Sequence, residues 1–235
     1  MQITEVTDSF NLDSVVPFFQ PIMDLENETV WSYECLARLV NLHENTYLPS
    51  QFLFLVERQH SVAQLTETIF NRSANYFRDI NMAWNINVSL SDMTDSVIQQ
   101  FFCSQLQDYP NPNRISIEIT AHNALTETQS FWSFSKMCAS FGVKIIIDHF
   151  DLTPESLEKV IELPVSAIKV PSKLFECDEK EHLELVQQLI MSSKINNIIL
   201  IAEHIEQEAT LTKVKNLGLK YAQGFYFSQP KASTQ

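Results

Sequence analysis

The sequence predicts an α/β protein, a closed (β/α)8 barrel that forms a single domain over residues 1–235. Short runs of β-branched and aromatic residues recur along the chain and alternate with longer stretches that have helical apolar spacing. This alternation implies parallel strands joined by crossover helices. The length of 235 residues is enough for one large core, and barrels of this kind occupy it without splitting into two domains.

Eight runs have the length and composition of buried strands, which favours a closed barrel over an open sheet. We expect these strands at 15–23, 30–39, 84–90, 115–120, 143–149, 165–170, 198–203 and 219–225. We expect helices at 62–77, 94–107, 127–140, 154–163, 181–193 and 207–217. Thr153 is expected to cap the helix that starts at Pro154, because proline is favoured at the first helical position.

The composition excludes several classes of function. With 16 basic and 29 acidic residues, the chain has a formal net charge of -13, which argues against nonspecific binding to DNA, RNA or an acidic membrane surface. The chain has only 3 glycines, at positions 142, 218 and 224. Dinucleotide-binding loops and P-loops need clustered glycines, so both are excluded.

The cysteines and the apolar runs point to a cytoplasmic protein without a membrane segment. The cysteines are scattered and form no C-x-x-C pair, so a zinc site has no support and reduced thiols are expected. They are Cys35, Cys103, Cys138 and Cys177. Residues 1–8 do not have the pattern of a signal peptide, and the apolar runs 52–56 and 198–202 are too short to span a bilayer.

Polar residues recur at the ends of the predicted strands, where a barrel places its active face. They are Glu34, Asn87, Glu118, Asp148, Lys169, Glu203 and Gln223. One such residue alone would be explained as a hydrogen-bonded strand end, but a set of this size indicates a site. Converging carboxylates either gain raised pKa values or bind a hard cation, and their oxygen ligands suit magnesium or manganese.

The segments 18–25 (FFQPIMDL) and 33–38 (YECLAR) resemble the opening of the EAL-type cyclic-di-GMP phosphodiesterase domain, with Cys35 in place of the signature alanine. Further blocks follow in the family's order. They are NVS at 87–89, EIT at 118–120, DHF at 148–150, IKV at 168–170, AEHIE at 202–206 and QGFYF at 223–227. The resemblance covers about residues 15–230, and so many blocks in register make chance similarity improbable.

The resemblance implies a modified TIM barrel that hydrolyses one phosphodiester of cyclic-di-GMP to linear pGpG with two divalent cations, Mg²⁺ or Mn²⁺. It assigns the first cation to Glu34, Asn87, Glu118 and Asp148, with Asp148 bridging to the second. Lys169 would help to activate the attacking water, and Glu203, Gln223 and Glu206 would complete the catalytic set. Arg38 would bind a phosphate, while Gln20 and Leu36 would line the nucleotide groove. Bound cations would also let an acidic mouth accept an anionic ligand.

The chain departs from the family at the second cation. His149 stands where the family has a second aspartate ligand, and the following loop has lost both of its glycines. Ala121 replaces a glutamate that steadies this loop, and His204 replaces a glycine beside Glu203. His149 is either a ligand of the second cation or a hydrogen-bonded histidine at a strand end. We therefore expect a weakened or altered second metal site.

Three functions stay open at this stage. The first is a slow phosphodiesterase, the second a cyclic-di-GMP sensor without turnover, and the third a protein-interaction regulator. The retained first-cation set argues against the third, because a scaffold has no need for buried converging carboxylates. We expect cyclic-di-GMP binding through a divalent-cation site with slow or impaired hydrolysis. The sequence leaves open whether the chain forms a homodimer or binds a protein partner.

Overall fold

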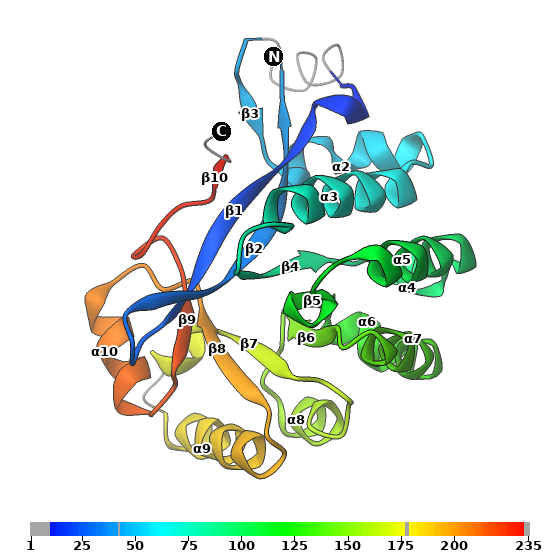
Figure 1. The fold of residues 1–235 in the computed structure, drawn as a ribbon. Helices are drawn as coiled ribbons and strands as arrows, with labels where there is room; N and C mark the ends of the chain where they lie inside the picture. Colours follow the sequence, from blue (N-terminus) through cyan, green and yellow to red (C-terminus); the bar gives the residue numbers. More distant parts are fainter. Residues whose placement is uncertain (1–9, 42, 177–178, 233–235) are drawn as a thin grey trace.

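The computed structural model describes residues 10–41, 43–176 and 179–232, and it confirms the closed barrel and its strands (Figure 1). The ring runs through β1 (Val15–Asp24), β9 (Tyr221–Gln223), β8 (Ile199–Glu203), β7 (Ala167–Pro171), β6 (Lys144–Asp148), β5 (Ile115–Thr120), β4 (Ala83–Asn87) and β2 (Thr29–Val40). It closes because β2 also pairs with β1. Two short strands extend it: β3 (Thr46–Tyr47) pairs with β2, and β10 (Lys231–Ala232) pairs with β1.

The expectation that all strands of the barrel are parallel was wrong for β1. This strand is antiparallel to both neighbours, β2 and β9. The reason is the connection to β2, because residues 25–28 are far too few for a crossover and form a tight hairpin instead. In that turn the Asp24 carboxylate accepts the backbone N–H groups of Glu26 and Asn27.

Helices flank the outside of the barrel (Figure 1). The described residues form α2 (Pro49–Arg58), α3 (Val62–Phe77), α4 (Leu90–Thr94), α5 (Ser96–Asp108), α6 (Ala121–Thr126), α7 (Thr128–Ser140), α8 (Pro154–Val160), α9 (Lys180–Ile195) and α10 (Glu208–Asn216). Short 3₁₀ turns are η1 (Leu12–Ser14), η2 (Pro112–Arg114) and η3 (Ser172–Phe175). The sequence analysis missed α2, α4 and α6. The predicted cap of α8 is confirmed, because the Thr153 hydroxyl accepts the N–H of Ser156 at 3.1 Å.

The interior of the barrel is layered. Side chains alternate along a strand, so the residue two positions before an inward-facing one also faces inward. Ile146, Ala167 and Ile201, which precede Asp148, Lys169 and Glu203 by two, accordingly pack with Ile22 in a fully buried apolar cluster. An apolar floor therefore supports a polar layer at the carboxyl ends of the strands. The larger core cluster packs the helices around the barrel.

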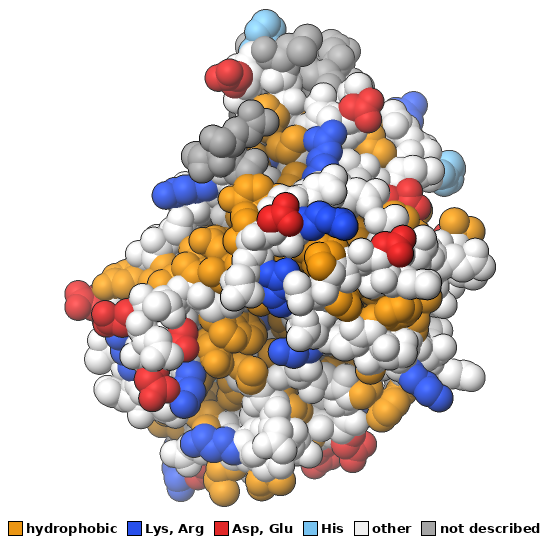
Figure 2. Space-filling view, viewed as in Figure 1, with side chains coloured by type: hydrophobic (Ala, Val, Ile, Leu, Met, Phe, Trp, Pro, Cys, Tyr) orange, Lys and Arg blue, Asp and Glu red, His pale blue; other side chains and the backbone are white. Residues whose placement is uncertain are grey.

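The surface mixes all types of side chain. On the face in Figure 2, hydrophobic side chains are visible in the middle, and charged ones of both signs lie among uncharged ones. Cys35, Cys103 and Cys138 are free thiols, whereas Cys177 lies outside the described residues. Among the helices that the structure describes, none is long and apolar enough to cross a bilayer.

Candidate functional site

A cleft of about 330 Å³ opens at the carboxyl ends of the barrel strands and gathers most of the predicted site residues. Its walls include Gln20, Glu34, Leu36, Arg38, Asp148, His149, Lys169, Glu203, Glu206 and Gln223. Of the predicted set, Asn87 and Glu118 are not part of the wall. Glu118 is buried beneath it, and Asn87 is exposed at the end of β4. The topology thus brings residues from distant parts of the sequence to one mouth.

Lys169 lies at the centre of the buried layer. Its ammonium donates to Glu34 Oε2 at 2.7 Å and to Glu118 Oε2 at 2.8 Å. All three side chains are almost fully buried, and they come from β7, β2 and β5. Each carboxylate therefore has a charged partner in a place where an unpaired charge would be costly.

The pKa values in this layer follow from burial and from the Lys169 charge. Burial would lower the pKa of Lys169, but Glu118 and Glu34 outweigh it, and the pKa lies well above its usual value. Burial would raise the pKa of Glu34, but Lys169 outweighs it, and the pKa lies below its usual value. Burial and then the Glu34 charge raise the pKa of Glu118 well above normal. The layer therefore holds Glu34 ionised and leaves Glu118 as the carboxylate closest to protonation.

Side-chain amides complete the partners of Glu34. Gln223 Nε2 donates to Glu34 Oε2 at 2.7 Å and to Gln20 Oε1 at 3.2 Å, and Asn87 Nδ2 donates to Glu34 Oε1 at 3.0 Å. Gln223 Oε1 is different, because this buried oxygen has no hydrogen-bond partner. A buried acceptor of this kind is normally satisfied by water, an ion or a ligand.

Asn85 and Ser32 belong to the same buried network but were missed in the sequence. Asn85 Nδ2 donates to Glu118 Oε1, and Ser32 Oγ donates to Asn85 Oδ1 at 3.0 Å. Asn85 lies two residues before Asn87, and Ser32 lies two residues before Glu34, so each shares the inward face of its strand. Strand alternation was the signal that could have revealed both.

His149 clamps the Asp148 carboxylate. Its backbone N–H donates to Asp148 Oδ1 at 2.7 Å, and its ring Nδ1 lies 2.8 Å from Asp148 Oδ2. His149 has a φ of 51°, in the left-handed region, which turns the N–H back toward the preceding carboxylate. Burial opposes ionisation of Asp148, but Lys169 and His149 outweigh it and lower its pKa to about 2. The hydrogen bond to Asp148 raises the pKa of His149. His149 is therefore hydrogen-bonded to Asp148 at the end of β6.

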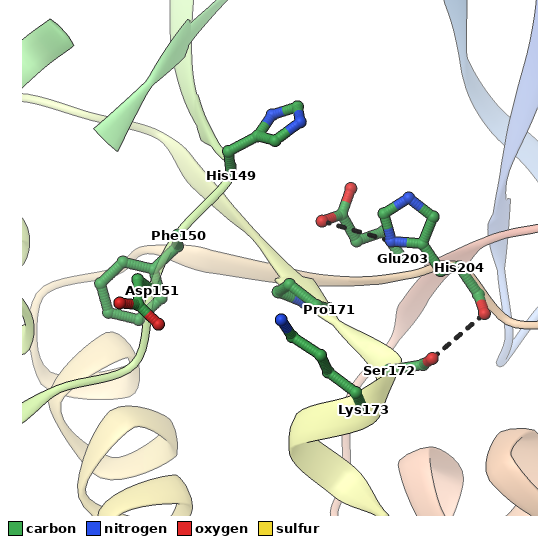
Figure 3. Close-up of a pocket in the computed structure, with 8 residues that line it drawn as sticks. All are labelled: His149, Phe150, Asp151, Pro171, Ser172, Lys173, Glu203 and His204. Atoms are coloured by element: carbon green, nitrogen blue, oxygen red, sulfur yellow. Dashed lines mark hydrogen bonds and ion pairs between the residues drawn. The ribbon is translucent and has the colours of Figure 1, made fainter. Parts of the chain in front are cut away.

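His204 forms a second histidine–carboxylate pair at the rim. Its φ is 58°, and its Nδ1 lies 3.6 Å from Glu203 Oε1. Burial and then the Asp148 charge raise the pKa of Glu203. Figure 3 shows Glu203 between the His149 and His204 rings. These residues also line a neighbouring hollow of about 470 Å³ that Lys173 and Pro171 border.

Gly224 fixes the rim near Gln223. The N–H of Ile205 donates to the carbonyl of Gln223 at 3.0 Å, and the N–H of Tyr226 donates to the carbonyl of Ile205 at 2.9 Å. A Cβ at position 224 would overlap the backbone nitrogen and oxygen of Ile205. Only glycine permits this close approach of two chain segments.

The EAL domain family matches residues 3–230. The chain belongs to the EAL domain family.

Curated relatives of this EAL domain include two proteins of Pseudomonas aeruginosa. MucR, a bifunctional diguanylate cyclase/cyclic di-GMP phosphodiesterase, is 25% identical over 234 residues, covering 94% of this chain and 34% of MucR. The cyclic di-GMP phosphodiesterase RocR is 22% identical over 228 residues, covering 91% of this chain and 56% of RocR. The EAL domain thus corresponds to part of each of these longer proteins.

Solved structures share the fold. The PaMucR phosphodiesterase in its c-di-GMP complex has a TM-score of 0.85 at 20% identity, covering 99% of this chain and 98% of that one. The EAL domain of FimX from Pseudomonas aeruginosa bound to c-di-GMP has a TM-score of 0.84 at 18% identity, covering 98% and 95%.

Arg38 lies at another part of the cleft of the EAL domain. Its Nη1 donates to the Ala37 carbonyl at 2.8 Å, and its guanidinium carbon lies 6.0 Å from the centre of the Phe18 ring. In the part of the chain that the structure describes, Arg38 makes no ion pair with a carboxylate. Its remaining donors are therefore available to an anionic ligand in the cleft.

The predicted ligands of the first cation match a hard cation in chemical type, but they are engaged with one another and with Lys169. The oxygens of Glu34, Asn87, Glu118 and Asp148 suit such a cation, and Gln223 Oε1 is a buried oxygen without a partner. Within residues 10–41, 43–176 and 179–232, no three His, Cys, Asp or Glu side chains are arranged to hold a metal ion. Instead, Lys169 engages Glu34 and Glu118, and His149 engages both oxygens of Asp148.

Proposed function

We propose that this EAL domain, a single domain over residues 1–235, binds cyclic-di-GMP at the mouth of the barrel with one divalent cation. We propose further that it hydrolyses the ligand slowly to pGpG. The observation that carries this proposal is the convergence of Glu34, Asp148, Glu203, Gln223 and Arg38 in one cleft. Membership of the EAL family and relatives that are cyclic di-GMP phosphodiesterases support the choice of ligand.

The cation in this proposal is held by Glu34, Asn87, Glu118 and Asp148 and is magnesium or manganese. When bound, it supplies a Lewis acid for the phosphate oxygens and makes a water molecule more acidic. Arg38 contributes a planar set of donors that suits a phosphate group. Gln20 and Leu36 line the same cleft and would contact the rest of the nucleotide.

Proton transfer in the proposed reaction depends on the side chains around the water. Glu203 is buried beside the rim histidines and has a raised pKa, so its carboxylate is suited to accept a proton. Gln223 Oε1 has no other partner and can accept a hydrogen bond from the same water. Lys169 holds the Glu34 and Glu118 oxygens in place. Glu206 lines the cleft close to His204, and we propose that it supports Glu203 from the rim.

The proposed slow rate follows from the Asp148–His149 clamp. Both Asp148 oxygens already accept from His149, so a second cation would have to share them with the ring nitrogen and the backbone N–H. The hydrogen bond to Asp148 also raises the pKa of His149, which favours the protonated ring at a place where a second cation would need a ligand. His149 could still bind a metal through Nε2 once its ring turns away, as the prediction from the sequence allows.

The test separates binding from turnover. We would measure cyclic-di-GMP binding by calorimetry with Mg²⁺ and then Mn²⁺, and follow pGpG by chromatography. We expect binding in both metals and pGpG formation much slower than that of the cyclic di-GMP phosphodiesterase RocR under the same conditions. Replacing the cleft arginine (Arg38→Ala) should weaken binding about tenfold, since it removes a charge-assisted hydrogen bond.

The matched control is Arg58→Ala, which removes an exposed arginine at the end of α2, outside the cleft. It should leave binding unchanged. Absence of binding in both metals would refute the proposed ligand. Turnover as fast as that of RocR would refute the proposed impairment, whereas binding without any pGpG would identify a sensor.

A further inference from the structure

A groove on the outside of the barrel lies at the amino-terminal ends of the strands, opposite the mouth. It has a volume of about 510 Å³ and is bounded by α7 on one side and by the segments that lead into β6 and β7 on the other. Its lining includes Trp132, Lys136, Ala139, Lys144, Ile145 and Pro164. None of these residues takes part in the candidate site.

The groove is open because the helix next to α7 is short. The crossover helices of adjacent strands are neighbours around a barrel, and α8 has 7 residues where α7 has 13. Trp132, Lys136 and Ala139 follow one another at helical spacing, so they form a single stripe along α7. All three are exposed. This stripe is therefore a helix face that no other described element covers.

Trp132 is exposed in an unusual way for tryptophan. Its exposed fraction is 48%, whereas Trp84 is fully buried and Trp31 packs against Tyr221 with ring centres 4.4 Å apart. Trp132 makes no ring contact with another aromatic residue that the structure describes. Exposed tryptophan in a groove is typical of protein interfaces, where it contributes a large share of the binding free energy.

The charge of the groove differs from that of the whole chain. Lys136 and Lys144 are exposed, and neither has an ion-pair partner among the described residues. The chain carries a net charge of -13, so these two lysines form a local basic site on an acidic molecule. Charges are screened over about 8 Å at physiological ionic strength, so a short acidic segment would interact chiefly with the lysines. A nucleic-acid backbone would extend beyond the two lysines on a chain whose net charge is -13.

We propose that this groove docks an acidic segment of a partner protein. An aromatic or aliphatic side chain of the segment packs against Trp132, and its carboxylates pair with Lys136 and Lys144. The groove contains both parts of such a site, an apolar anchor and two unpaired positive charges, within one surface. This function is independent of the nucleotide proposed for the mouth.

The test is a selection of short random peptides displayed on phage against the purified full chain. We expect the selected peptides to be enriched in Asp and Glu around an aromatic or aliphatic residue. The affinity of one selected peptide is then measured by fluorescence anisotropy. Trp132→Ala and the double variant Lys136→Glu/Lys144→Glu should each weaken binding at least about tenfold.

The matched control is Lys194→Glu/Lys215→Glu, which makes the same change in net charge at exposed lysines of α9 and α10, outside the groove. It should leave the affinity within about twofold. Equal weakening by both double variants would refute the groove, because the effect would then be one of net charge. Peptides without acidic enrichment, or tighter binding of a single-stranded RNA, would also refute the proposal.

The groove could instead be occupied by a second copy of the chain, and a further measurement distinguishes this from a separate partner. We would compare the sedimentation of the wild type, of Lys136→Glu/Lys144→Glu and of the control variant. The three proteins are expected to show the same oligomeric state. Self-association that Lys136→Glu/Lys144→Glu abolishes and the control retains would assign the groove to a dimer and refute a separate partner.

Discussion

The buried layer and the rim of the barrel mouth are built differently. In the layer, Lys169, Glu34 and Glu118 are almost fully buried and hold one another through short charged contacts. At the rim, the side chains of His149 and His204 are 75% and 69% exposed, and each contacts a single carboxylate. Both rim histidines adopt left-handed backbone conformations, unlike any residue of the layer.

This difference separates stability from function. The layer is fixed by packing and paired charge, so changes there should affect folding first. The rim is exposed and held by few contacts, so changes there should affect ligands and cations more than folding. Substitutions in the two regions can test this division.

The largest expected effect is that of Lys169→Met, which leaves Glu34 and Glu118 buried without a cation. We expect a loss of about 3–5 kcal/mol in the free energy of unfolding at pH 7, measured in urea. The loss should shrink as the pH falls. Without Lys169, burial raises the pKa values of the two carboxyl groups in the folded state above those in the unfolded state. Lowering the pH protonates them in the folded state, which removes the buried charges and restores stability.

The control for this substitution is Lys159→Met, since Lys159 pairs with Glu155 on the exposed side of α8 at 2.6 Å. No measurable loss is expected there, because an exposed ion pair is screened by solvent. A loss below about 1 kcal/mol for Lys169→Met would contradict the importance of the charged layer.

The next effect is that of Gly224→Ala, which tests the support of the rim. The added methyl group would overlap the backbone of Ile205, and backbone cannot move aside as a side chain can. We expect a loss of about 3 kcal/mol in the free energy of unfolding. In Gly218→Ala the methyl group would meet open space, so only the unfavourable φ of 80° remains and about 1 kcal/mol should be lost. Equal losses would show that Ile205 does not constrain Gly224.

His149→Asp tests whether the clamp limits the second cation. Asp tolerates the left-handed conformation of this position, and it replaces a raised-pKa imidazole with a carboxylate. We expect Mn²⁺ affinity, measured by titration calorimetry, to rise about tenfold, and pGpG formation to increase. His149→Asn removes the same ring contact without adding a charged ligand, so it should raise Mn²⁺ affinity less than His149→Asp does. Tighter Mn²⁺ binding without faster turnover would place the defect in the loop that follows.

The strands of the fold could be predicted because buried strands carry a local signal. Runs such as 115–120 and 143–149 are apolar and β-branched, and both appear within one residue of their predicted bounds as β5 and β6. The direction of β1 was missed because the apolar pattern of a strand does not depend on its direction. Helix α6 was missed because it has 6 residues, too few for a periodic pattern, and depends on its Thr120 cap.

The candidate site could be predicted where a polar residue interrupts an apolar strand. Glu34, Asp148 and Lys169 are of this kind, and they meet at the mouth because the strands are in register. What could not be predicted is the pairing within the site. The contact of His149 with Asp148 depends on a left-handed backbone at a non-glycine residue, and side-chain sequence patterns do not report φ.

The smallest expected effect is that of His204→Gly, at a position where the backbone has a φ of 58°. Glycine removes the cost of a left-handed conformation but adds freedom to the unfolded chain, so we expect a gain of about 0.5 kcal/mol in the free energy of unfolding. Asn197→Gly, at a φ of 56°, should gain less, because asparagine tolerates this conformation. A loss for His204→Gly would show that the contact with Glu203 outweighs the strain. A gain together with weaker cyclic-di-GMP binding would show that the rim gives up stability for ligand contact.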